Sequence, residues 1–368
     1  MQATQQLHAL GQSLWLDNIS RGLLTGGGLQ RYINEFSVTG LTSNPTIFDK
    51  AVKDTDFYDA AIHKKTAAGK SGEELFFELA LEDLSQAADL FRTVHDASKG
   101  VDGWVSLEVS PLLADDSAAT IKAAVQLHGR AQRPNLLIKI PGTRAGIPAI
   151  EEAIFKGVPI NVTLLFSREQ YLQAANAYLC GIERRLVAGL DPQITSVASL
   201  FVSRWDGAVR DKVPKELRNR LGIAIAKQAY QAYCELHASS RWRKLAAAGV
   251  RKQRLLWAST GTKNADASDT LYIEALAAPD TINTLPEKTL QAFADHGEVR
   301  GVLPTDGGDA EAVLKQFAWL GVNTTALAAQ LQREGTQSFD QSWADLMQSI
   351  AAKSTALKAE AKTRAAHI

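Results

Sequence analysis

The sequence NLLIKIPGT, residues 135–143, sets one lysine inside an apolar run that a Pro-Gly pair ends. Apolar residues in such a short run predict a buried strand followed by a turn. Lysine is seldom buried without a function, because burial disfavours its charged form. A neutral amine attacks carbonyl groups, so one interpretation is that Lys139 forms a Schiff base. The alternative is a lysine at a strand end whose ammonium reaches solvent.

Seven other short runs resemble strands, and helical segments alternate with them along the chain. They lie at 13–20, 38–46, 103–111, 158–167, 194–204 and 254–264, with a weaker one at 279–287. This alternation predicts parallel βα units, and eight such units predict an α/β fold closed into a (β/α)8 TIM barrel. The alternative is an open doubly wound sheet, which normally carries a dinucleotide-binding glycine pattern that this sequence lacks.

The 368 residues are expected to form a single barrel domain over 1–368. A helical insertion is expected at about 47–99 and a C-terminal extension of helices at about 305–368, with separate helical segments at 310–322, 324–335 and 337–366. Residues 21–28, RGLLTGGG, are expected to form a flexible loop. The glycine triplet lacks the spacing of a phosphate-binding loop, so it is interpreted as a hinge or turn.

Composition excludes several classes of function. Lys plus Arg and Asp plus Glu both total 40, so no net field favours nucleic acid or an anionic membrane. No apolar run is long enough to span a membrane, and residues 1–12 lack the features of a signal peptide. Cys180 and Cys234 lie in helix-like contexts, which fits a cytoplasmic location. Because no HxH, HExxH or CxxC spacing occurs, we expect neither a metal nor another cofactor.

Strand side chains alternate between two faces, and one face of the predicted strands is polar. Its members are Trp15 and Asp17, Thr42 and Asn44, Ser106 and Glu108, Leu137 and Lys139, Asn161 and Thr163, Val197, Ser199 and Phe201, and Trp257 and Ser259. The opposite face, with Ile138 and Ile140, is apolar and is expected to meet the helices. Burying so many polar groups is costly unless they line a wet site, and barrel active sites lie at the C-terminal ends of the strands. We therefore predict an active site around Lys139.

The polar face suits imine chemistry on a ketose. Lys139 is expected to form the imine, which accepts electrons when a carbon–carbon bond breaks. That cleavage needs a base, for which Asp17 and Glu108 are candidates. Glu108 with Thr163 is expected to hold a water that carries protons during imine formation and hydrolysis.

Other polar residues near the strand ends suit the binding of a phosphorylated sugar. Asn44, Asn161 and Ser199 are expected to hydrogen-bond sugar hydroxyls. Arg204, Ser259 and Lys263 follow the sixth and seventh predicted strands, where barrels often bind phosphate. The alternative for the two cations is that they are solvated loop charges.

Two motifs, GLTSNPTIF at 40–48 and LLIKIPGTRAGI at 136–147, resemble the signature motifs of transaldolases. Further segments fall in the same order as in that family, and the resemblance covers the whole chain: LDNIS (16–20), SLEVSP (106–111), INVTLLFS (160–167), SLFVSR (199–204) and WASTGTKN (257–264). The length and the segments 102–111 and 257–264 are most similar to the longer bacterial branch of the family.

The resemblance implies a barrel that transfers a dihydroxyacetone unit from sedoheptulose 7-phosphate or fructose 6-phosphate to glyceraldehyde 3-phosphate or erythrose 4-phosphate. It implies that Lys139 is the Schiff-base lysine and that Asp17 is the acid/base at the C4 hydroxyl. It further implies that Glu108 and Thr163 hold the catalytic water. The implied substrate contacts are Asn44, Asn161, Ser199 and Phe201, and the implied phosphate-site residues are Arg204 and Ser259.

One position departs from the family pattern. The shorter branch has an arginine two residues after the serine that Ser259 matches, whereas this chain has Gly261 there and its next cation at Lys263. Two alternatives to a transaldolase stay open: a fructose-6-phosphate aldolase-like lyase that releases free dihydroxyacetone, and a non-catalytic sugar-phosphate binder. A monomer or a homodimer is expected.

Overall fold

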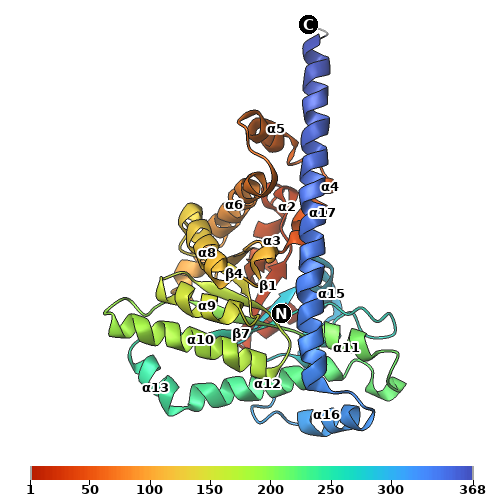
Figure 1. Ribbon diagram of the computed structural model, residues 1–368. Coiled ribbons are helices and arrows are strands. Elements are labelled where there is room, and N and C mark those ends of the chain that lie inside the picture. The colour runs from red at the N-terminus through yellow and green to blue at the C-terminus, as the bar shows by residue number, and fades with distance from the viewer. Residues whose placement is uncertain (1, 367–368) are drawn as a thin grey trace.

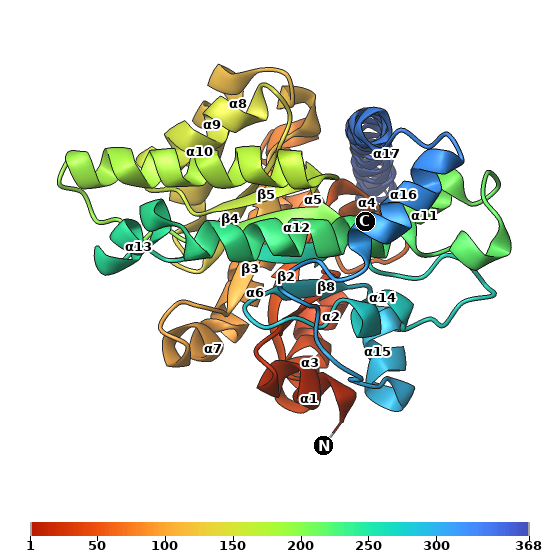
Figure 2. The same cartoon turned by 90° about the horizontal axis from the view of Figure 1, so that it is seen from below.

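The computed structural model describes residues 2–366 and contains a closed barrel of eight parallel strands in sequence order. Figures 1 and 2 show the strands at the centre, with helices packed around them. The strands are β1 Ser13–Asp17, β2 Val38–Thr42, β3 Trp104–Glu108, β4 Leu136–Pro141, β5 Ile160–Leu165, β6 Ser196–Phe201, β7 Arg254–Ala258 and β8 Ile282–Leu285. The predicted (β/α)8 barrel is therefore confirmed. The weak run at 279–287 contains β8, which closes the barrel by pairing with both β7 and β1.

The register of the strands places the polar residues opposite one another on neighbouring strands. Glu108 of β3 lies opposite Lys139 of β4, and Lys139 in turn lies opposite Asn161 of β5. On the adjoining strands, Asp17 of β1 lies opposite Thr42 of β2, which in turn pairs with β3. Asp17, Thr42 and Glu108 end their strands and Lys139 lies in the second half of β4, toward the mouth that the βα loops form, whereas Asn161 is the second residue of β5.

Helices follow the strands and cover the outside of the barrel. Their bounds are α1 Ala3–Ala9, α2 Arg21–Thr25, α3 Gly28–Phe36, α8 Ser117–Ala131, α9 Gly146–Phe155, α10 Arg168–Val187, α11 Ser203–Val209, α12 Leu221–Ala238, α13 Ser240–Ala247, α14 Leu271–Ala275 and α15 Glu287–His296. Short 3₁₀ turns lie at Pro111–Leu113 and Lys215–Leu217. Side-chain caps fix several helix starts: the Ser167 hydroxyl, for example, accepts the Gln170 N–H that begins α10.

The loop expected at 21–28 is wrong in part, because it contains the short helix α2. The Ser20 hydroxyl accepts the Leu23 N–H and so caps this helix. The Arg21 side chain forms a salt bridge with Asp83 at 2.8 Å, which holds the helix against the insertion. These tertiary contacts outweigh the flexibility that the glycine triplet suggests.

Two groups of helices lie outside the regular βα pattern. The first joins β2 to β3 and comprises α4 Pro45–Lys53, α5 Asp59–Ala67, α6 Gly72–Leu90 and α7 Arg92–Ala97. The second follows β8 and α15 and comprises α16 Ala310–Trp319 and α17 Thr324–Ala366.

Helix α17 is a single helix of 43 residues, whereas the sequence suggested two segments on either side of Thr336. Figure 1 shows it running along one side of the molecule, past α4, and projecting beyond the barrel at its C-terminal end. Residues 367–368 of the expected extension lie outside the described residues. Within residues 2–366, no helix combines the length and the apolar character that crossing a membrane requires.

The barrel interior makes one glycine necessary. A Cβ added at Gly40 of β2 would lie 2.5 Å from Nε1 of Trp15, a neighbour on β1. We predict that Gly40→Ala lowers the free energy of unfolding by about 1–3 kcal/mol, because the indole or the strand must shift. Urea unfolding followed by circular dichroism measures this change.

The control for this prediction is Gly129→Ala in α8, where an added Cβ meets nothing within 4 Å. Alanine favours helices, so this change is expected to leave stability unaltered or to raise it by up to about 1 kcal/mol. Equal destabilisation by both substitutions would contradict the packing argument.

Candidate active site

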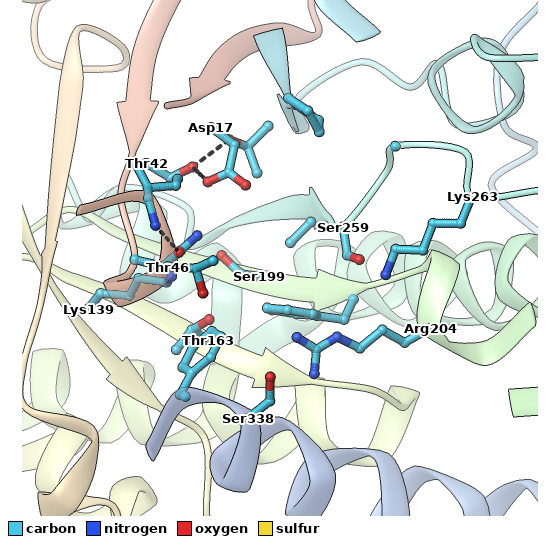
Figure 3. Close-up of a pocket in the computed structure, with 18 residues that line it drawn as sticks. Asp17, Thr42, Thr46, Lys139, Thr163, Ser199, Arg204, Ser259, Lys263 and Ser338 are labelled. Carbon is cyan, nitrogen blue, oxygen red and sulfur yellow. Dashed lines mark hydrogen bonds between the residues drawn. The ribbon is translucent and has the colours of Figure 1, made fainter. Parts of the chain in front are cut away.

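A cavity of about 280 Å³ lies at the C-terminal ends of the strands (Figure 3). Most of the residues that the sequence predicts for the site line it: Asp17, Asn44, Lys139, Thr163, Ser199, Phe201, Arg204, Ser259 and Lys263. Glu108 and Asn161 are not in the cavity wall. The structure therefore gathers residues from six strand ends around one space.

Lys139 is buried at the base of this cavity and is only 5% exposed. Its Nζ donates a hydrogen bond to Oε2 of Glu108 at 3.0 Å and another to the backbone carbonyl of Ser43 at 3.3 Å. Glu108 is itself 6% exposed. The amine therefore does not reach open solvent, which rules out the interpretation of Lys139 as a strand-end lysine in water.

The two carboxyl groups of the site have altered acidity. Burial raises the pKa of Glu108, and this effect outweighs the opposing influence of the Lys139 cation. Burial also raises the pKa of Asp17, against the opposing effects of Lys139 and of a hydrogen bond from Thr42. A raised pKa lies closer to neutral pH, and a carboxyl group with such a pKa is a more effective acid/base catalyst there. Both groups are thus suited to acid/base work.

A row of hydrogen bonds lies behind the cavity wall. Asn161 is fully buried, donates from Nδ2 to the Ser106 hydroxyl at 3.1 Å and accepts from the Ser199 hydroxyl at 2.7 Å. Ser199 reaches the cavity while Asn161 stays beneath it. This geometry makes Asn161 a support for Ser199, and its direct contact with a substrate stays a prediction.

Thr163 has an unusual environment on the cavity wall. Its hydroxyl is buried and has no hydrogen-bond partner among the described residues. Buried hydroxyls normally have a partner, so this group is free to bind a water or a substrate atom. The next residue, Leu164, has a φ of 58° where the pairing of β5 with β6 shifts register. This bulge turns the strand end at the cavity.

The opposite end of the cavity is positively charged. Arg204 and Lys263 both line it, and neither forms a salt bridge in the described part of the chain. Burial lowers the pKa of Arg204, and burial together with the nearby Arg204 cation lowers the pKa of Lys263. Figure 3 shows both side chains extending toward the cavity, with Ser259 beside Lys263. The Glu334 carboxylate partly offsets the lowering of the Arg204 pKa but forms no salt bridge with Arg204 among the described residues, so the two neighbouring cations suit the binding of an anion.

Sequence reasoning missed several cavity-lining residues, of which Thr42 and Phe339 are the most informative. Thr42 lay on the predicted polar face but received no role, although its hydroxyl bonds the Asp17 carboxylate at 2.7 Å. Phe339 and its neighbour Ser338 come from α17, which lies more than 150 residues along the chain from most of the strands. The sequence signal for this face is Phe339 and Trp343, one helical turn apart in the stretch 333–345, whose other residues are small or polar.

The fold and this cavity define a (β/α)8-barrel enzyme whose reactive groups gather at the C-terminal ends of the strands. Comparison with known proteins narrows the class. The family model described as transaldolase/fructose-6-phosphate aldolase matches residues 14–350. The chain belongs to this family.

Individual relatives are similar over nearly their whole length. A transaldolase of Arthrobacter sp. (strain FB24) is 44% identical over 353 residues, which cover 94% of this chain and 95% of that protein. A transaldolase of Saccharopolyspora erythraea is 42% identical over 360 residues, covering 95% and 98%. A transaldolase of Mycobacterium tuberculosis (strain CDC 1551 / Oshkosh) is 44% identical over 352 residues, covering 93% and 94%.

The hydrogen bond from Thr42 to Asp17 generates a prediction. Removing it in Thr42→Val should raise the pKa of the Asp17 carboxyl further, because this bond stabilises the ionised form. A pH titration of ¹³C-carboxyl-labelled aspartate by NMR, with Asp17→Asn to identify the signal, measures the shift. Thr39→Val is the control, because Thr39 lies on the same strand and its hydroxyl bonds the Leu14 carbonyl instead of Asp17. A lower or unchanged Asp17 pKa in Thr42→Val would contradict the assigned role.

Proposed function

We propose that this protein is a transaldolase. It transfers a dihydroxyacetone unit from sedoheptulose 7-phosphate or fructose 6-phosphate to glyceraldehyde 3-phosphate or erythrose 4-phosphate, in the non-oxidative pentose phosphate pathway. The observation that carries the proposal is the Lys139–Glu108 pair, 3.0 Å apart and buried at one end of a cavity. The cations Arg204 and Lys263 at the other end, neither of which forms a salt bridge among the described residues, suit a sugar phosphate.

The reaction begins when Lys139 attacks the ketose carbonyl. The ammonium first gives up a proton, and Glu108 at 3.0 Å is placed to accept it. Loss of water from the adduct leaves a protonated imine between Nζ and C2 of the sugar. Glu108 and the free Thr163 hydroxyl hold the water that moves protons in this step, as the family resemblance implies.

Cleavage of the carbon–carbon bond depends on Asp17 as a general base. Its carboxylate takes the proton of the C4 hydroxyl, the C3–C4 bond breaks, and the electron pair moves into the imine to give an enamine. The aldehyde product leaves, and an acceptor aldehyde then reacts with the enamine by the reverse steps. Thr42 holds the Asp17 carboxylate in place for this proton transfer.

The remaining predicted residues position the sugar. The side-chain oxygen Oδ1 of Asn44 accepts the Ile47 N–H and so caps α4. The side-chain nitrogen Nδ2 of Asn44 is left to donate to a sugar hydroxyl. Ser199 and Phe201 line the wall between the two ends of the cavity. Arg204, Ser259 and Lys263 bind the phosphate, with Lys263 in place of the arginine of the shorter branch.

The close alternative is an aldolase that releases free dihydroxyacetone, since the family description includes both activities. The names of relatives that are 42–44% identical over most of the chain favour transfer. Product analysis with fructose 6-phosphate alone, then with erythrose 4-phosphate added, separates the two. Steady release of dihydroxyacetone without an acceptor as the main activity would contradict the transaldolase proposal, and the absence of any turnover would favour a sugar-phosphate binder.

We further propose a cytoplasmic protein with one domain, as a monomer or a homodimer. Both cysteines, Cys180 and Cys234, are free thiols in the structure, which is consistent with a reducing compartment.

The imine itself is directly testable. Borohydride reduction in the presence of fructose 6-phosphate should leave a covalent sugar adduct on Lys139, located by peptide mass mapping. Lys139→Met should abolish turnover and the adduct while the thermal unfolding transition is retained. The control is Lys122→Met on the exposed surface of α8, which should keep full activity. An adduct on another lysine would contradict the mechanism.

The cationic end of the cavity gives a second prediction. Lys263→Met should raise the KM for fructose 6-phosphate by about 10- to 100-fold, because a charge-assisted contact to phosphate is lost. The activity with unphosphorylated fructose should change by much less. Steady-state kinetics with both sugars measure the difference, and an equal loss for both would show that Lys263 does not act on the phosphate.

A further inference from the structure

Helix α17 is held against the mouth of the barrel by its own side chains. Nε2 of Gln332 donates to the backbone carbonyls of Gly142, after β4, and of Leu164, at the bulge of β5, both at 3.0 Å. One turn further, a Cβ added at Gly335 would lie 2.9 Å from Leu164 Cδ2 and 3.3 Å from Arg204 Nη1. A glycine within a helix costs about 1 kcal/mol relative to alanine, and here it allows the helix to approach the site closely.

The next turn of α17 supplies part of the cavity wall. Lys139 Nζ lies over the ring of Phe339 at 5.5 Å from its centroid. Phe339 is only 6% exposed, although it comes from a helix outside the barrel. Figure 3 shows the neighbouring Ser338 on the α17 ribbon, on the side of the cavity where Thr163 and Arg204 lie. The ring therefore occupies space next to the reacting amine that water would otherwise fill.

Contacts beyond the cavity fasten the helix in this position. Trp343, one turn after Phe339, packs against Phe76 and Phe77 of α6, with ring centroids 5.1 and 5.8 Å apart. The Ser349 hydroxyl donates to the Asp49 carboxylate of α4 at 2.6 Å. Lys353 donates to the Val52 carbonyl at the end of α4 at 2.8 Å.

We propose that Phe339 is a specificity-determining residue that keeps water from protonating the enamine carbon beside the Lys139 nitrogen, so that the bound three-carbon unit is passed to an aldehyde instead of being released. This inference rests on the proposed transaldolase function. Phe339 reaches the reacting nitrogen only because Gln332, Gly335 and Trp343 hold α17 close to the strand ends.

The step that the ring suppresses is the loss of dihydroxyacetone. For release, the carbon nucleophile of the enamine takes a proton, which regenerates the protonated imine. Water then adds to the imine carbon, the C–N bond breaks, and dihydroxyacetone and the free amine of Lys139 result. In transfer the aldehyde acceptor adds to the same carbon in place of the proton, and the new imine is then hydrolysed by water in the same way, so the two routes differ only at the enamine carbon. An apolar ring beside Nζ disfavours protonation of that carbon, because it leaves no hydrogen-bond partner for a water that could deliver the proton there.

The experiment measures the ratio of free dihydroxyacetone release to transfer onto erythrose 4-phosphate, with fructose 6-phosphate as donor. In Phe339→Ala this ratio should rise about tenfold or more, which corresponds to a modest change in relative barrier heights. Phe339→Leu keeps an apolar group beside the imine and should stay close to the wild-type ratio. Ser349→Ala, which removes a contact of the same helix outside the cavity, is the matched control and should also match the wild type.

Borohydride trapping on the same proteins separates the possible failures. If the wild type forms no adduct on Lys139, the proposed function fails and this inference with it. If all variants form the adduct but Phe339→Ala keeps the wild-type ratio, the inference alone is overturned. Should Phe339→Ala not fold, Phe339→Gln replaces the ring by an amide that can hold water. An unchanged ratio in that variant would overturn the proposal, and a raised ratio would support it.

Discussion

The ion pair between Lys139 and Glu108 is the interaction on which the rest of the structure depends. Taking both charges out of water is costly, and well-packed apolar residues at such positions are often as stable or more so. The pair is therefore poor support for stability. Its geometry requires the register of β3 against β4, which in turn requires a closed barrel with both strands in place. The chain thus maintains a costly arrangement whose value lies in its chemistry.

Charge is distributed unevenly along the cavity. At the Lys139 end, burial raises the pKa of both Asp17 and Glu108, so protons move easily between carboxyl groups, amine and substrate. At the other end, Arg204 and Lys263 lie together without a salt bridge in the part of the chain that the structure describes. An anionic group bound there relieves the repulsion between the two cations. We therefore propose that a phosphorylated sugar binds with its phosphate at this cationic end, away from the reacting carbon.

Much of this arrangement is readable from the sequence, because period-2 alternation in the strands is a local property. This alternation alone places Lys139, Asp17 and Thr163 on one face of the predicted strands. It did not show that Asn161 lies below the cavity, since depth depends on how strands stagger around the barrel. Nor did it reveal Phe339, whose position depends on the packing of α17 against residues far away in sequence. The spacing of Phe339 and Trp343 marks an apolar face of the helix, but no local pattern shows which part of the barrel that face packs against.

The central claim is that Lys139 forms a covalent imine with the substrate. NMR of the ¹⁵N-lysine-labelled protein mixed with fructose 6-phosphate carrying ¹³C at C2 tests it most directly, because a bond between the two labels gives a one-bond coupling. The account predicts this coupling in the native protein and its loss in Lys139→Met. Absence of the coupling in the native protein during turnover, or its persistence in Lys139→Met, would contradict the account.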